Sequence, residues 1–215
     1  MVDVALGRSP HAKWYEEAES NKKAQYRSKV YGSVRRAVDY LQGEIELPEI
    51  VQVRFGSRRL TGRNTYAMAS GATIYFGECM FDENGADGDT YAMLGVSGHE
   101  LSHLSDFMTD NDCLDFGIDN DLVSEGKAEV VGSDVGGENY VHLLCNPPTV
   151  EPRDIAEGLV RPAQEPLRKV KNGNGVYSAG KLMVGRVLEA DGVSIYDVHA
   201  RNADYFIDRF IEVSL

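Results

Sequence analysis

The stretch GVSGHELSHLSDF, residues 95–107, decides how the rest of this sequence is interpreted. It holds two of the five histidines of the chain, four positions apart, with a glutamate directly after the first. Apolar residues recur around them at helical spacing, which predicts a helix over about 90–108. On that helix His99 and His103 lie on one face, one turn apart, so that both imidazoles can reach a single metal ion.

Residues 99–103 fit the pattern His-Glu-x-x-His, which is typical of a zinc site that activates water. In such a site the two histidines bind the ion, and Glu100 accepts a proton from water as it attacks a carbonyl. From this composition a chance match is expected on the order of once in a hundred sequences of this length, which disfavours two surface histidines without a metal. Because two histidines and a carboxylate also serve iron, Zn²⁺ is an inferred cofactor.

A third protein ligand is required, because catalytic zinc sites combine three side chains with one open position. The downstream histidines, His142 and His199, stand in less suggestive contexts. The stretch LVSEGKAEVVG, residues 122–132, offers Glu125 in an apolar, small-residue setting. The gap after His103 is long enough for a loop to turn back and a second helix to present this carboxylate. The alternative for Glu125 is a solvated acidic face, the commoner position of a glutamate.

Two further acidic residues are candidates for orienting the ligands. Glu129 lies one turn beyond Glu125 and can hold His103 through its second ring nitrogen. Asp106 lies about one turn beyond His103 and could do the same. The alternative for Glu129 is again a solvated face, and for Asp106 a solvated or capping position at the helix end is favoured.

The spacing of these residues resembles that of the gluzincins, the thermolysin-like zinc metallopeptidases of the peptidase MA clan. The matching residues are His99-Glu100-x-x-His103, followed by Glu125-x-x-x-Glu129. The resemblance implies that His99, His103 and Glu125 bind zinc and that Glu100 is the general base.

A second similarity lies in residues 177–198, which resemble the Tyr-x-x-Gly helix of aminopeptidase-like gluzincins. In that branch the tyrosine stabilises the oxyanion, and Tyr177 is the matching position, with Gly180 completing the motif. The alternative is a packing tyrosine, one of 11 in the chain. The Gly-x-Met-Glu-Asn signature that holds a substrate amino terminus is absent, since residues 66–70 lack its acidic residue. An endopeptidase is therefore favoured over an aminopeptidase.

The order of elements predicts an α+β fold. We expect one or two helices over 13–42, strands over 49–55 and over 65–78 with a break at Gly71, and helices thereafter. The later helices are expected near 121–144, 153–170, 177–190 and 194–213. The small residues Gly95, Ser97 and Gly98, just before the first histidine, allow another segment to approach closely.

The family resemblance implies a zincin-like arrangement of a single domain over 1–215. Residues 1–108 would form an α+β lobe with a small sheet, ending in the motif helix, and residues 109–215 an all-helical lobe, with the active-site cleft between them. The strand before the motif helix, within 71–78, would border the cleft and pair with an extended peptide substrate.

The charge, hydropathy and cysteine content of the chain limit which partners and which cellular compartment are expected. With 22 basic and 34 acidic residues the net charge is −12, which argues against nucleic acid and anionic membranes as partners. No apolar run is long enough to cross a bilayer, and the N-terminus lacks the pattern of a secretory signal. Cys79, Cys113 and Cys145 are too widely spaced for a disulfide framework, which favours reduced thiols in the cytoplasm.

These features together predict a zinc-dependent peptidase that acts on a peptide or protein substrate. Two other functions stay open. One is a non-catalytic zinc-binding module of the same fold, because an intact site can persist without turnover. The other is a metal hydrolase of a non-peptide amide or ester, which the water-activating residues alone do not distinguish from a peptidase.

Overall fold

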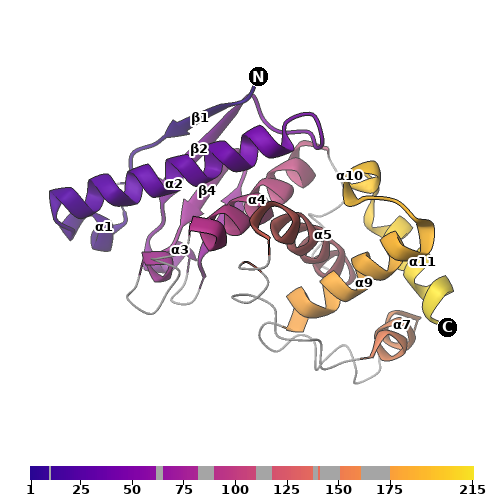
Figure 1. Ribbon diagram of the computed structural model, residues 1–215. Coiled ribbons are helices and arrows are strands. Elements are labelled where there is room, and N and C mark those ends of the chain that lie inside the picture. The colour runs from indigo at the N-terminus through magenta and orange to yellow at the C-terminus, as the bar shows by residue number, and fades with distance from the viewer. Residues whose placement is uncertain are drawn as a thin grey trace. The chain divides into compact units, whose positions relative to one another are not determined.

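The computed structural model describes residues 1–9, 11–61, 65–81, 90–109, 118–137, 140, 151–160 and 175–215. Within them the protein is α+β, as predicted, with one four-stranded sheet and mostly helices. The chain divides into two compact units, one of Met1–Met108 with Gly132–Leu143 and the other of Thr109–Val131 with Leu144–Leu215. Figure 1 labels the elements of both units.

The sheet of the first unit has the strand order β1-β2-β4-β3. These strands are, in that order, Asp3–Leu6, Ile50–Phe55, Thr73–Phe76 and Ala67–Ser70. β1 is parallel to β2 and β2 to β4, whereas β3 runs antiparallel to β4. β4 is therefore an inner strand, and β3 lies at the edge of the sheet.

This strand order corrects the prediction that residues 71–78 pair with a peptide substrate. The main chain of β4 is hydrogen-bonded to β2 on one side and to β3 on the other, so it has no free edge. β1 was not predicted, because four residues are too few for a periodic pattern and its partner, β2, begins only at Ile50. Residues 65–78 were predicted to form one or two strands broken at Gly71, and they form two, β3 and β4.

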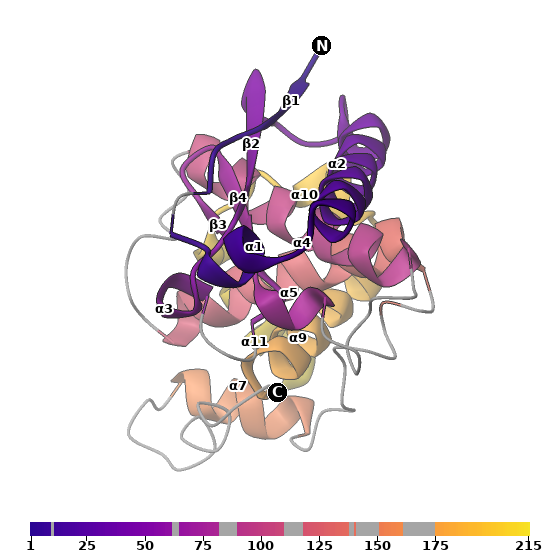
Figure 2. The same cartoon turned by 90° about the vertical axis from the view of Figure 1, so that its left-hand side faces the viewer.

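Two long helices pack on this sheet and on each other. α2 (Ser20–Leu41) contacts β1, and α4 (Thr90–Met108) contacts β3 and β4. Figure 2 shows α2 and the strands as neighbouring layers of the first unit. The buried stripe of α2 follows the predicted helical spacing, and β2 buries alternate residues as a strand with one core face does. The buried residues are Val30, Ser33, Val34, Ala37, Val38 and Leu41 of α2 and Val51, Val53 and Phe55 of β2.

Aromatic rings anchor the short elements at one end of β2. Trp14 of α1 (Lys13–Glu17) donates from Nε1 to the Gly56 carbonyl at 2.8 Å. The same indole stacks on Phe81 of η1 (Glu78–Phe81), with ring centroids 5.7 Å apart, and meets Phe55 edge-on. α3 (Arg58–Thr61) follows directly after the turn at Gly56. The predicted helical region 13–42 is thus two helices, α1 and α2.

The described residues of the second unit are helical. They form α7 (Pro152–Val160), α9 (Gly175–Asp191), α10 (Ile195–Val198), α11 (Ala203–Ser214) and the first turns of α5 (Ile118–Gly136). The predicted helix near 194–213 is two helices, because Asn202 caps α11 by accepting a hydrogen bond from the Tyr205 amide at 3.2 Å.

α5 begins earlier and ends earlier than the predicted helix 121–144. Its end is set by Gly137, which has a φ of +68° and donates its amide hydrogen to the Ser133 carbonyl at 2.9 Å. This is the usual C-terminal glycine of a helix, in a backbone conformation that other residues adopt at a cost.

An ion-pair network joins the end of α9 to α11. The Tyr205 hydroxyl and the Arg209 guanidinium each hydrogen-bond the Asp191 carboxylate at 2.7 Å. The hydrogen bond from Tyr205, followed by that from Arg209, lowers the pKa of Asp191 below its ordinary value of 3.8. A carboxyl whose pKa is lowered by folding stabilises the folded state at pH values above its unfolded pKa.

We therefore expect the contribution of Asp191 to be complete near neutral pH and to disappear as the pH falls below about 4. The thermal unfolding temperatures of the wild type and of Asp191→Asn, measured from pH 7 to pH 2, test this. The wild type should be the more stable above pH 5, and the two curves should converge in acid. A difference that persists unchanged to pH 2 would show that the charge of Asp191 is not what stabilises the pair of helices.

Three residues discussed above, Cys113, Cys145 and His142, lie outside the described residues, so the predicted state of the two thiols is not addressed by the structure. Across the part of the chain that the structure describes, no helix combines the length and apolar character needed to cross a membrane.

Candidate metal centre

The two motif histidines meet on α4 as their spacing predicts. The Nε2 atoms of His99 and His103 lie 3.1 Å apart, and the two rings are nearly perpendicular, with an interplanar angle of 79°. His99 is buried and His103 is half-buried. Both rings therefore present the same nitrogen to one point beside the helix.

Glu125 on α5 completes a set of three. Each of His99, His103 and Glu125 offers one ligand atom, and these atoms all lie within 4.8 Å of one another. Among the described residues, no other group of histidine, cysteine, aspartate and glutamate side chains meets this condition. His199 does not belong to the set; it is buried on the second unit, where its carbonyl accepts a hydrogen bond from Lys127 Nζ at 3.1 Å.

The C-terminal turns of α5 pack closely on α4 inside the first unit. Within the first unit, a Cβ placed on Gly136 would lie 2.6 Å from the Cα of Gly95, closer than real side chains come. The main chains of the two helices therefore touch there, as the small residues before His99 predict. Glu125 precedes Gly132 by seven positions and Gly136 by eleven, so at 3.6 residues per turn it lies on the same face of α5.

The three side chains fit a zinc ion by the chemistry and spacing of their donors. Two imidazole nitrogens and one carboxylate oxygen are the ligand set of many catalytic zinc sites. Two nitrogens bound at about 2.0–2.1 Å to a tetrahedral zinc are roughly 3.3–3.4 Å apart, close to the 3.1 Å between the histidine Nε2 atoms. The set leaves one position of a tetrahedron for water or substrate.

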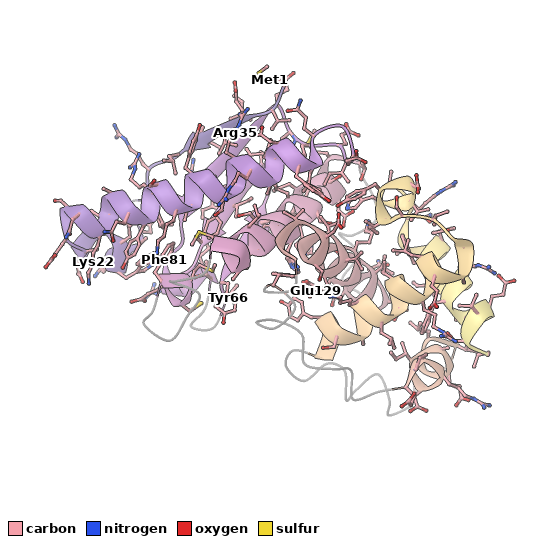
Figure 3. All side chains as sticks on the ribbon, viewed as in Figure 1. Met1, Lys22, Arg35, Tyr66, Phe81 and Glu129 are labelled. Atoms are coloured by element: carbon pink, nitrogen blue, oxygen red, sulfur yellow. The ribbon has the colours of Figure 1, made fainter. Side chains whose placement is uncertain are left out.

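Three acidic residues that are close in sequence to the candidate ligands are buried. Glu100 is 5% exposed and Asp106 is 2% exposed on α4, and Glu129 is fully buried on α5, where Figure 3 labels it. The solvated positions considered for Glu129 and Asp106 are therefore wrong. A carboxylate is rarely buried unless hydrogen-bond donors or cations pair with it. The burial of these three carboxylates is therefore consistent with the roles predicted for them beside the candidate ligands. The predicted roles of Glu129 and Asp106 in orienting a histidine, and of Glu100 as general base, stay predictions.

The Tyr177-x-x-Gly180 motif lies on α9, which crosses α5 inside the second unit. A Cβ on Gly126 would lie 2.3 Å from the Gly180 carbonyl oxygen, and one on Gly180 would lie 2.3 Å from the Leu122 carbonyl oxygen. Gly180 therefore allows α9 to approach α5 beside Glu125. Tyr177, one turn before Gly180, is half-buried, and its catalytic role stays a prediction.

Tyr140, which contacts the candidate ligand His99, was not predicted from the sequence. Tyr140 is fully buried, and its hydroxyl lies 3.0 Å from Nδ1 of His99. A signal for it was present in the glycines of residues 132–136, which weaken a helix and therefore indicate that something packs against its backbone. Only the folded chain shows that a tyrosine ring is the neighbour.

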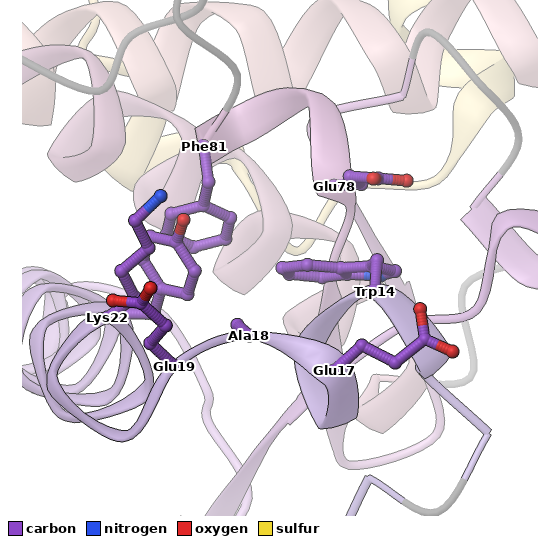
Figure 4. Close-up of a pocket in the computed structure, with 8 residues that line it drawn as sticks. Trp14, Glu17, Ala18, Glu19, Lys22, Glu78 and Phe81 are labelled. Carbon is purple, nitrogen blue, oxygen red and sulfur yellow. The ribbon is translucent and has the colours of Figure 1, made fainter.

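A separate recess of the first unit lies beside α1 and the start of α2, with a volume of about 300 Å³. Figure 4 shows its wall of Trp14 and Phe81 together with the carboxylates of Glu17 and Glu78 and the side chain of Lys22. None of its acidic side chains belongs to a set close enough to share a metal ion among the residues that the structure describes.

Comparison of the chain with protein-family models, with curated proteins and with solved structures found no match. The function is therefore inferred from the chemistry of the side chains themselves.

Proposed function

We propose that the protein is a zinc-dependent metallopeptidase of the gluzincin type. The observation that carries the proposal is the convergence of His99, His103 and Glu125, whose ligand atoms lie within 4.8 Å of one another. The spacing of these residues, with a glutamate directly after the first histidine, supports hydrolysis over a structural metal site, because a structural zinc site needs no such base.

Each residue has a distinct part in this proposal. His99, His103 and Glu125 would hold the ion, which when bound would supply Lewis acidity to a scissile carbonyl and to water. Glu100 would accept a proton from the attacking water at its carboxylate and pass it to the leaving amine. Tyr177 would donate its phenol hydrogen to the oxygen that becomes negative.

A peptide is the proposed substrate because of the edge strand. β3 is paired with β4 on one side only among the described strands, and it packs on α4, the helix that carries the motif. An extended peptide could pair with its main chain by strand addition, which depends little on side chains. Side-chain selectivity would then come from elsewhere, in agreement with the absence of an amino-terminus-binding signature. The proposed class is an endopeptidase.

Metal content is the measurement that tests the proposal most directly. Elemental mass spectrometry should find about one zinc per wild-type chain, and Glu125→Ala should lose most of it, because two imidazoles alone leave a catalytic zinc one ligand short. Asp134→Ala, an exposed acidic residue on the same helix, is the matched control and should keep its zinc. A wild type that takes up no zinc when zinc is added would overturn the proposal.

Chelation then separates the remaining functions. A peptidase should hydrolyse a mixed pool of quenched fluorescent peptides, lose that activity when zinc is removed and regain it when zinc returns. Full zinc occupancy with no turnover of any peptide would indicate the non-catalytic module. Turnover of small amides or esters in place of peptides would indicate the non-peptide hydrolase.

A further inference from the structure

Within the first unit, Tyr140 contacts a candidate metal ligand, His99, on the side of its ring away from His103. Its side chain has no exposed surface, and its hydroxyl oxygen lies 3.0 Å from Nδ1 of His99. The Nε2 atom of the same imidazole faces His103 at 3.1 Å. The imidazole of His99 therefore has the second candidate ligand, His103, at Nε2 and the Tyr140 hydroxyl at Nδ1.

Three glycines on two helices make the space for this tyrosine. A Cβ on Gly95 of α4 would lie 2.4 Å from Cδ2 and Cγ of the Tyr140 ring. On α5, a Cβ on Gly132 would lie 2.8 Å from Cε1 and Cζ, and one on Gly136 would lie 2.8 Å from the Tyr140 Cβ. Any side chain at these positions would displace the ring or separate the helices. The glycines therefore form a slot that fits one aromatic ring and fixes where its hydroxyl points.

The chemistry of imidazole determines what the hydroxyl can do there. A neutral histidine has one protonated and one unprotonated ring nitrogen, and only the unprotonated nitrogen can bind a metal. If Nε2 of His99 binds zinc, Nδ1 carries the hydrogen and donates it to the Tyr140 oxygen. A hydrogen bond to the far nitrogen of a ligand histidine fixes both the tautomer and the direction of the ring.

We infer that Tyr140 is a positioning residue for His99: it accepts the Nδ1 hydrogen and holds the imidazole with its Nε2 lone pair directed at the metal. The inference rests on the metal centre of the proposed function. Tyr140 supplies a neutral oxygen, whereas a carboxylate in its place would add a second negative charge behind a centre that already includes Glu125. Tyr140 thus orients the His99 imidazole while polarising that ring less than a carboxylate would.

Tyr140→Phe is the variant that tests this role, because the ring still fills the glycine slot while the hydroxyl is removed. Long-range ¹H–¹⁵N correlation spectra of the metal-free protein report the tautomer of each histidine. In the wild type His99 should be protonated at Nδ1, and in Tyr140→Phe a substantial part should shift to the Nε2-protonated form. Zinc affinity, measured by competition with a chromophoric chelator, should fall about tenfold, the lower end of the range for such partners.

Tyr40→Phe is the matched control. The Tyr40 hydroxyl also makes one hydrogen bond in the first unit, to Asp134 at 2.8 Å, but at an exposed position. This control should leave the His99 tautomer and the zinc affinity at their wild-type values. Unfolding temperatures of both variants show whether either change reflects a loss of structure, because a purely structural role for Tyr140 would lower stability without shifting the tautomer.

The outcomes distinguish this inference from the proposed function. An unchanged tautomer together with unchanged zinc affinity in Tyr140→Phe would overturn the positioning role, even if the wild type is an active zinc peptidase. A wild type that binds no zinc would overturn the proposed function. The tautomer measurement, which needs no metal, would then decide by itself whether Tyr140 orients His99.

Discussion

Glu100→Gln should lower the turnover number on peptides by about 10²–10⁴-fold while the zinc content stays at the wild-type level. An amide has nearly the size and shape of the carboxylate, so the buried site around Glu100 should accept it. It cannot take up a proton from water, which is the step the proposed reaction requires of this side chain. Glu100 is not in the set of ligand atoms, so the ion should remain.

The measurement pairs steady-state kinetics on a fluorescent peptide pool with elemental mass spectrometry on the same preparation. Glu189→Gln, the same chemical change at an exposed position of α9, is the matched control and should leave both quantities unchanged. A Glu100→Gln protein that retains zinc and turns over peptides at the wild-type rate would rule out Glu100 as the general base. Loss of zinc together with activity would indicate a structural role for Glu100.

Gly180→Ala should destabilise the protein by about 3 kcal/mol, the upper end of the usual range for an overpacked core. Its Cβ would lie 2.3 Å from the Leu122 carbonyl oxygen and 2.8 Å from the Gly126 amide nitrogen. Both atoms belong to the main chain of α5, so no side-chain rotation can relieve the overlap. α9 and α5 would have to move apart, and the packing beside Glu125 would move with them.

Gly185→Ala provides the control on the same helix. No atom outside its own helix lies within 4 Å of a Cβ at Gly185, so alanine should stabilise the protein by about 0.5–1 kcal/mol through helix propensity. Chemical denaturation with urea measures both free energies of unfolding. Two variants of equal stability would show that the close approach of α9 and α5 at Gly180 is not required by the fold.

Much of the fold follows from short-range patterns. The spacing of apolar residues predicts α2 and α4, and alternation predicts β2, because a helix and a strand repeat every 3.6 and two residues regardless of what they pack against. β1 and the order of the strands could not be predicted in this way. Pairing in a sheet joins residues far apart in the sequence, and the four residues of β1 carry no repeat of their own.

The burial of the acidic residues near the candidate ligands could not be predicted from short-range patterns either. Acidic residues such as Asp106 and Glu129 are usually exposed, and a solvated or capping position was favoured for Asp106. Both are buried in the folded protein. Burial depends on which helix faces meet, and a single helix does not encode its neighbour.

The sequence alone determined the pairing of His99 with His103, because residues four apart on a helix share a face whatever surrounds them. The sequence also places Glu100 directly after His99, the first candidate ligand. Only the tertiary structure decided that Glu125 reaches the two histidines and that Tyr140 lies behind His99. Such contacts join residues that are far apart in the sequence. The space left by Gly95, Gly132 and Gly136 accommodates the Tyr140 side chain only when α4 and α5 pack together.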